Sequence, residues 1–115
     1  MLLALAAAPG FVSLAAAHAF LDRAIPAVGS VVRESPAQIK LRFTERLEPP
    51  FSSVQVLDMN GSRVDRRDSV VDRTDAALLI VSLPRLAPGV YRVTWRVLSV
   101  DTHVTEGDFT FEVAP

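Results

Sequence analysis

The stretch that decides the fold is Val90-Tyr91-Arg92-Val93-Thr94-Trp95-Arg96-Val97-Leu98. Apolar and polar residues alternate along it, so that the aromatic and valine side chains share one face and the arginines and the threonine share the other. A period of two predicts a half-buried β-strand whose apolar face belongs to the core. Trp95 lies on that apolar face, and we expect it to anchor the strand.

Segments of similar character lie elsewhere in the chain. Residues 38–44 alternate in the same way, residues 53–58 form a strand that ends at an Asn60-Gly61 turn, residues 77–83 are almost continuously apolar, and residues 107–113 close the chain. No segment has a helical period over 11 or more residues. The pattern predicts an all-β fold, an antiparallel immunoglobulin-like β-sandwich with Greek-key connections and about seven strands.

Two segments are expected to lie outside regular strands. Residues 21–36 contain two prolines and a glycine and are interpreted as an extended entry segment with turns. Residues 63–75 are dense in charge and are interpreted as a solvated loop or hairpin arm. Asp65 is accordingly expected to be a surface carboxylate, and Glu106 and Asp108 are expected to flank a turn at Gly107.

Residues 1–17 carry no charge and end in three alanines, which is typical of a secretory signal peptide, although a basic lead-in is missing. A membrane anchor is the alternative, but Pro9 and Gly10 interrupt a segment that is shorter than the roughly 20 residues that span a bilayer. We expect cleavage after Ala17. The remaining domain, residues 18–115, is then an exported protein without stable membrane insertion.

The composition excludes several functions. The chain has no cysteine, so it offers no thiolate for metal or redox chemistry. Its 12 basic and 13 acidic residues nearly balance, which gives no indication of nucleic acid as a partner. We expect a monomer.

The chain has only two histidines, His18 and His103, and both fall where a metal could use them. After cleavage, His18 would provide its α-amino nitrogen and its Nδ1 atom. His103 and Asp101 lie two residues apart, and an extended backbone would point both side chains to the same side. Three nitrogens and one oxygen suit Cu(II) or Ni(II), and Cu(II) binds most tightly in the divalent series. Taken singly, an Asp-x-His pair or a surface histidine is usually a solvated side chain.

The order of several motifs resembles the CopC family of periplasmic copper-binding proteins. These motifs are His18-Ala19, Leu41-Arg42-Phe43-Thr44-Glu45, Pro88-Gly89-Val90-Tyr91-Arg92-Val93-Thr94-Trp95-Arg96 and Ser99-Val100-Asp101-Thr102-His103. The resemblance implies a β-sandwich that binds one Cu(II) ion through His18, Asp101 and His103. It also implies that Glu45 lies near the site, as a weak axial ligand or as an acceptor for a histidine N–H group.

The resemblance further implies a copper carrier or buffer for homeostasis or resistance, not an enzyme, with an inner-membrane copper transporter of the CopD type as its partner. A Cu(I) site rich in methionine is not expected, because Met59 is the only methionine after residue 17. Two alternatives remain. One is a copper monooxygenase with a histidine brace, and the other is a metal-free immunoglobulin-like binding module.

Overall fold

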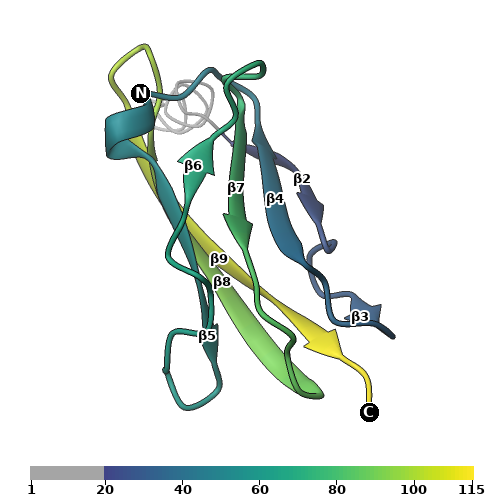
Figure 1. The fold of residues 1–115 in the computed structure, drawn as a ribbon. Coiled ribbons are helices and arrows are strands. Elements are labelled where there is room, and N and C mark those ends of the chain that lie inside the picture. Colours follow the sequence, from purple (N-terminus) through teal and green to yellow (C-terminus); the bar gives the residue numbers. More distant parts are fainter. Residues whose placement is uncertain (1–19) are drawn as a thin grey trace, which may run out of the picture.

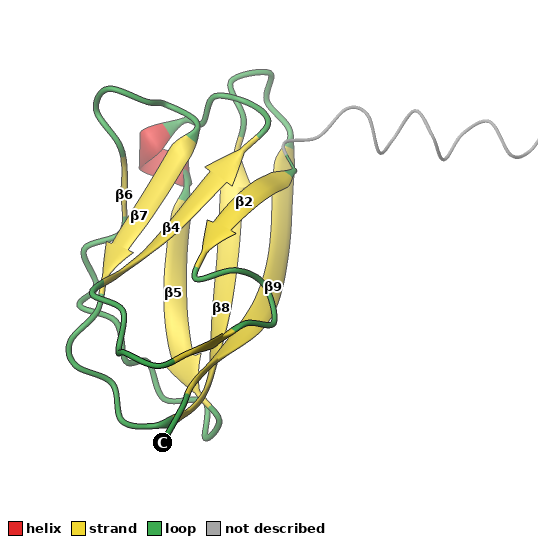
Figure 2. Cartoon of the chain, turned by 90° about the vertical axis from the view of Figure 1, so that its right-hand side faces the viewer, coloured by secondary structure: helices red, strands yellow, loops and turns green. Residues whose placement is uncertain are grey.

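The computed structural model describes residues 20–115, which form two β-sheets packed face to face (Figures 1 and 2). The first sheet has the order β2 (Leu21–Ile25), β4 (Gln38–Phe43), β7 (Leu78–Ser82) and β6 (Val70–Val71). The second has the order β3 (Val31–Val32), β9 (Val104–Val113), β8 (Gly89–Leu98) and β5 (Ser53–Asp58). A short 3-10 helix, η1 (Pro49–Phe51), precedes β5. The prediction of an all-β sandwich is confirmed.

The long β8–β9 hairpin forms the centre of the second sheet. Its two strands pair from Gly89 opposite Val113 to Leu98 opposite Val104. The alternation in β8 is confirmed, since Val93 and Val97 are fully buried while the arginines between the inward positions are exposed. Buried leucine, isoleucine and valine side chains of β4 and β7 face this hairpin across the sandwich and complete the core.

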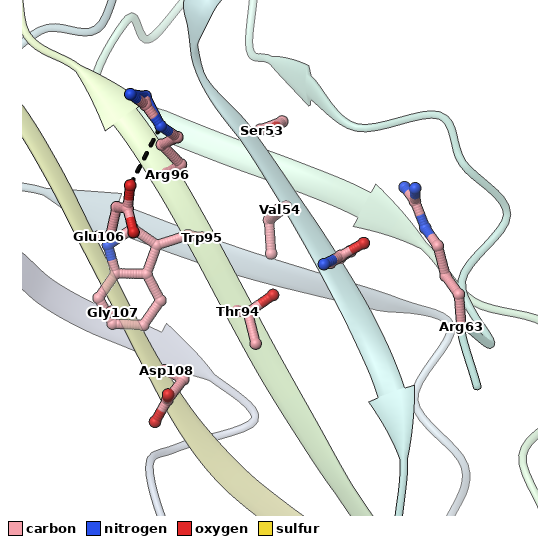
Figure 3. A pocket seen from close by; sticks show the side chains of 10 residues that line it. Ser53, Val54, Arg63, Thr94, Trp95, Arg96, Glu106, Gly107 and Asp108 are labelled. Carbon is pink, nitrogen blue, oxygen red and sulfur yellow. Dashed lines mark ion pairs between the residues drawn. The ribbon is translucent and has the colours of Figure 1, made fainter. Parts of the chain in front are cut away.

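Trp95 packs at the edge of this core and is only partly buried. The centre of its indole lies 6.0 Å from that of Phe43 and 6.2 Å from that of Phe109. Figure 3 shows the indole lying over β9 at Gly107, where a Cβ atom would overlap the ring. The expectation of a turn at Gly107 was therefore wrong. Gly107 lies within β9, where it pairs with Trp95 of β8, and the indole leaves no room for a larger side chain there.

The entry segment forms two short strands instead of a plain extended lead-in. β2 pairs antiparallel with β4, and the chain then turns at Gly29, whose φ angle of 72° is one that glycine adopts readily. The turn brings β3 beside the end of β9, and these two strands run parallel. The second sheet is thus mixed, whereas the sequence had indicated antiparallel pairing throughout. Within residues 20–115, no helix has the length and apolar character needed to cross a membrane.

Residues 62–69, which we call the strap, cover the free edge of β5. The backbone of β5 is satisfied at three places, where Asp58 N–H donates to Ser62, Val56 N–H donates to Asp65 and Val54 N–H donates to Ser69. The strap also reaches the other sheet, because the Arg66 amide donates to the Ser82 carbonyl and Ser82 donates to Asp68. The charged segment is therefore a connection between the two sheets and not a solvated arm.

Asp65 is the centre of the strap, and the prediction of a surface carboxylate was wrong. Its side chain is fully buried, and it accepts hydrogen bonds from the Val56 and Arg67 amides, both at 2.9 Å. Arg63 Nε lies 2.9 Å from Asp65 Oδ1 and provides the opposite charge. Burial alone would raise the pKa of Asp65, but the hydrogen bonds from Arg63 and the two amides hold that pKa below its usual value.

Candidate metal centre

Asp101 and His103 lie in residues 99–103, the loop that joins β8 to β9. This loop is not extended, because the Ser99 amide donates to the His103 carbonyl at 3.0 Å and Thr102 has a φ angle of 75°. The condition of an extended backbone past Ser99 is therefore not met, but the two side chains do meet. His103 Nδ1 lies 3.2 Å from Asp101 Oδ1. The turn achieves the proximity that the spacing of two residues had suggested.

The Asp101–His103 pair is accessible to a metal ion. Each side chain is 45% exposed, so an ion can approach without displacing the core. Imidazole nitrogens and carboxylate oxygens bind transition metals at about 2.0–2.2 Å, which places neighbouring donors about 3 Å apart. The observed spacing of 3.2 Å fits two donors to one ion with little movement.

Ser99 holds this pair from beneath, and sequence reasoning did not identify it. The residue is fully buried at the end of β8, and its hydroxyl donates a hydrogen bond to Asp101 Oδ1. This hydrogen bond, with further help from His103, lowers the pKa of Asp101 below its usual value. The signal that was overlooked is the spacing Ser99-x-Asp101-x-His103, which puts a hydroxyl two residues before the carboxylate.

The segment that carries Glu45 lies beside the loop. The Val100 amide donates to the Arg46 carbonyl at 2.9 Å, and the Glu48 amide donates to the Leu98 carbonyl at 2.8 Å. Glu45 itself is exposed. Its neighbour Thr44 bonds in both directions with Phe20, the first described residue. The chain therefore enters the sandwich at the same end as the β8–β9 loop, as Figures 1 and 2 show.

His18 and the expected signal peptide, residues 1–17, lie outside the described residues. Within residues 20–115, no three His, Cys, Asp or Glu side chains gather closely enough to hold a metal by themselves. The structure thus brings Asp101 and His103 together but does not join Glu45 to them. A metal site of three residues would therefore need one ligand in addition to Asp101 and His103.

A hollow in the described surface lies away from this loop. It is on the outer face of β5, β8 and β9, and polar side chains line it, including Gln55, Thr94 and Arg96 (Figure 3). Arg96 is held there by Glu106 on the neighbouring strand, with 3.1 Å between Nε and Oε2. Neither Asp101 nor His103 reaches this hollow. The candidate metal centre is instead an open site at the end of the sandwich.

The chain is thus a small β-sandwich domain with an exposed carboxylate–imidazole pair at one end. Comparison with known proteins gives the family: residues 21–114 match the CopC domain. The chain belongs to the CopC family. Membership of this family supports a general copper-related role for the chain.

Three curated relatives illustrate the family. The chain is 37% identical to protein YobA of Escherichia coli K12 over 98 residues, which are 84% of this chain and 79% of YobA. It is 35% identical to copper resistance protein C of Pseudomonas syringae pv. tomato over 107 residues, 88% of this chain and 84% of that protein. Copper transport protein CutJ of Bacillus subtilis is 31% identical over 98 residues, which are 84% of this chain but only 18% of CutJ.

A solved structure supports the fold. The crystal structure of CopC from Methylosinus trichosporium OB3b superposes with a TM-score of 0.76 at 38% identity, covering 85% of this chain and 95% of that chain. At this identity and coverage, the two-sheet arrangement described above is the fold of the family.

Proposed function

We propose that this protein is a periplasmic carrier or buffer that binds one Cu(II) ion and hands it to a membrane transporter. The observation that carries the proposal is the Asp101–His103 pair, with an oxygen and a nitrogen 3.2 Å apart and open to solvent. Of the three relatives described above, the two whose names state a role are a copper transport protein and a copper resistance protein. The proposed recipient is an inner-membrane transporter of the CopD type, and the carrier acts as a monomer.

The remaining ligands in this proposal come from His18. Signal-peptide cleavage after Ala17 makes His18 the first residue, so that its α-amino nitrogen and Nδ1 can bind the ion together. The pairing of Phe20 with Thr44 supports this, because it fixes the chain two residues after His18 at the end of the sandwich that holds the loop. Glu45, next to Thr44, is proposed as a weak axial ligand or as an acceptor for a histidine N–H group.

The donor set favours Cu(II) over Cu(I). Imidazole, amine and carboxylate are ligands suited to Cu(II), whereas Cu(I) prefers thiolate and thioether. Met59 directly follows Asp58, the last residue of β5, which pairs with Tyr91 near the start of β8. The loop that holds Asp101 and His103 follows the opposite end of β8. The sulfur of Met59 is therefore remote from Asp101 and His103.

The proposal is tested on the exported, processed protein. Mass spectrometry should find His18 as the first residue, and competition with a chelator should show one Cu(II) ion bound. Asp101→Ala and His103→Ala should each weaken Cu(II) binding by more than the 10- to 100-fold that is typical of removing an outer-shell partner. Asp72→Ala, which removes a carboxylate with only local hydrogen bonds, is the matched control and should bind like the wild type.

One further variant separates the chelate from ordinary histidine binding. An extra residue before His18 converts the α-amine to an amide, and Cu(II) affinity should collapse. Unchanged affinity would exclude the amine as a ligand. Oxygen-dependent release of oxidised sugars by the copper-loaded protein would favour the brace-type enzyme instead, and we expect none.

A further inference from the structure

Ser99 connects the two side chains of the candidate centre to the rigid part of the fold. Its own backbone is fixed in two ways, because Ser99 forms a bridge with Leu47 and its amide donates to the His103 carbonyl at 3.0 Å. The residue is completely inaccessible to solvent, and it follows directly on Leu98, the last residue of β8. The hydroxyl is thus a fixed point beneath an exposed loop.

From this fixed point the hydroxyl reaches both metal-capable residues. It donates a hydrogen bond to Asp101 Oδ1, and it lies 3.4 Å from the backbone nitrogen of His103, which can donate to it. The same His103 nitrogen also lies 3.4 Å from Asp101 Oδ1. Ser99, Asp101 and His103 therefore form a closed set of contacts in which the serine is the only buried member.

We infer that Ser99 is the positioning residue of the copper site, which holds the Asp101 carboxylate and the His103 backbone in the arrangement that binds Cu(II). This inference rests on the proposed function. An exposed aspartate on a loop would otherwise rotate freely about its side-chain bonds, and binding would have to order it. The hydrogen bond from a buried hydroxyl removes that freedom before the ion arrives.

Ser99 does not bind the ion in this proposal. Its oxygen is inaccessible, and its hydrogen is directed to Asp101 Oδ1. It therefore acts through Asp101, and its loss should change the affinity and the geometry of the site without abolishing the ligands. Replacement of an outer-shell partner typically lowers metal affinity by about 10- to 100-fold.

The chain offers a matched control for Ser99. Ser52 is also buried, and its hydroxyl accepts a hydrogen bond from the amide of Leu98 at 3.1 Å. Leu98 is the last residue of β8 and directly precedes Ser99. None of the hydrogen bonds of the Ser52 hydroxyl goes to Asp101 or His103. Ser52→Ala therefore removes a comparable buried hydrogen bond one residue away without touching the site.

The experiment compares wild type, Ser99→Ala, Ser99→Thr and Ser52→Ala as exported proteins titrated with Cu(II) alone. The readouts are affinity by chelator competition, the Cu(II) electron paramagnetic resonance spectrum, and thermal stability of the metal-free protein. Ser99→Ala should lose about 10- to 100-fold in affinity and show an altered copper spectrum. Ser99→Thr, which keeps the hydroxyl, should show the wild-type spectrum. Ser52→Ala should have the same Cu(II) affinity and the same spectrum as the wild type.

The outcomes separate this inference from the proposed function. If wild type binds Cu(II) but Ser99→Ala binds equally well with the same spectrum, the positioning role is overturned and the copper function stands. If Ser52→Ala changes affinity and spectrum as much as Ser99→Ala, the effect is general loss of packing and the positioning role is again overturned. If wild type binds no Cu(II), the proposed function fails and this inference fails with it.

Discussion

Replacement of Asp65 by alanine should destabilise the protein more than any change at an exposed acidic residue. The carboxylate is fully buried, pairs with Arg63 and satisfies the Val56 and Arg67 amides. Removing one partner of a buried ion pair typically costs about 3–5 kcal/mol. Arg63 is 28% exposed and can turn toward water, which places the loss at the lower end.

The orphaned Val56 amide adds to this loss, since an unsatisfied buried donor costs about 1–3 kcal/mol. Water can reach the opened strap and offset part of that cost, so we expect a total of about 3 kcal/mol. For a domain of this size, 1 kcal/mol corresponds to about 4–8 °C in Tm, and the melting temperature should fall by about 12–24 °C.

Urea unfolding followed by the fluorescence of Trp95, the only tryptophan, measures this loss. Asp72→Ala is the control, because its carboxylate makes only exposed local hydrogen bonds, and it should change the free energy of unfolding by about 0.5 kcal/mol or less. A loss below about 1 kcal/mol in Asp65→Ala, or an equal loss in the control, would refute the view that the strap is held by a buried carboxylate.

Four further results are expected. The pKa of Asp65 is lower in the folded state than in the unfolded state, where it is about 3.9. The stability that Asp65 contributes is therefore complete above the unfolded-state pKa and is lost as the pH falls through the folded-state pKa. Acid unfolding should accordingly be steeper in the wild type than in Asp65→Asn. Gly107→Ala forces a methyl group into the Trp95 indole and should cost about 1–3 kcal/mol, with a changed near-ultraviolet circular dichroism spectrum; an unchanged spectrum would contradict the packing. Cu(II) at a free concentration 100 times its Kd should raise stability by about 2.7 kcal/mol, and a chelator should reverse the gain; no shift in Tm would count against a folded-state site. Affinity should also fall as the pH drops below neutral, because nitrogen ligands bind metals only when deprotonated, and a titration flat from pH 8 to 5 would argue against them.

The sequence predicted the strands whose burial alternates. Residues 90–98 became β8, and residues 38–44 became β4 with one residue fewer, because an apolar side chain at every second position faces a single core. β9 begins at Val104, earlier than expected, since its first half carries polar residues on both faces and shows no such pattern. Its strand character comes from pairing with β8, which is a tertiary effect.

The strap could not be predicted, because its charge density is typical of a solvated loop. What overrides this tendency is the unpaired edge of β5, whose backbone donors Asp65 and Ser69 satisfy. Similarly, the spacing of Asp101 and His103 indicated the site, but the role of Ser99 depends on a turn with Thr102 in the left-handed region. A hydrogen bond from a side chain to a backbone group far away in the sequence follows no sequence pattern, so a single sequence does not predict it.

The strap has a consequence for how the protein behaves in a crowded compartment. The strand edge that it covers is the kind of surface on which a second chain can add a strand, and such addition begins aggregation. Because one carboxylate holds the strap at Val56, local opening there would uncover the edge while the rest of the sandwich stays folded. Protonation of Asp65 weakens one of the three attachments of the strap to β5, so self-association through this edge is expected to increase in acid before the core unfolds.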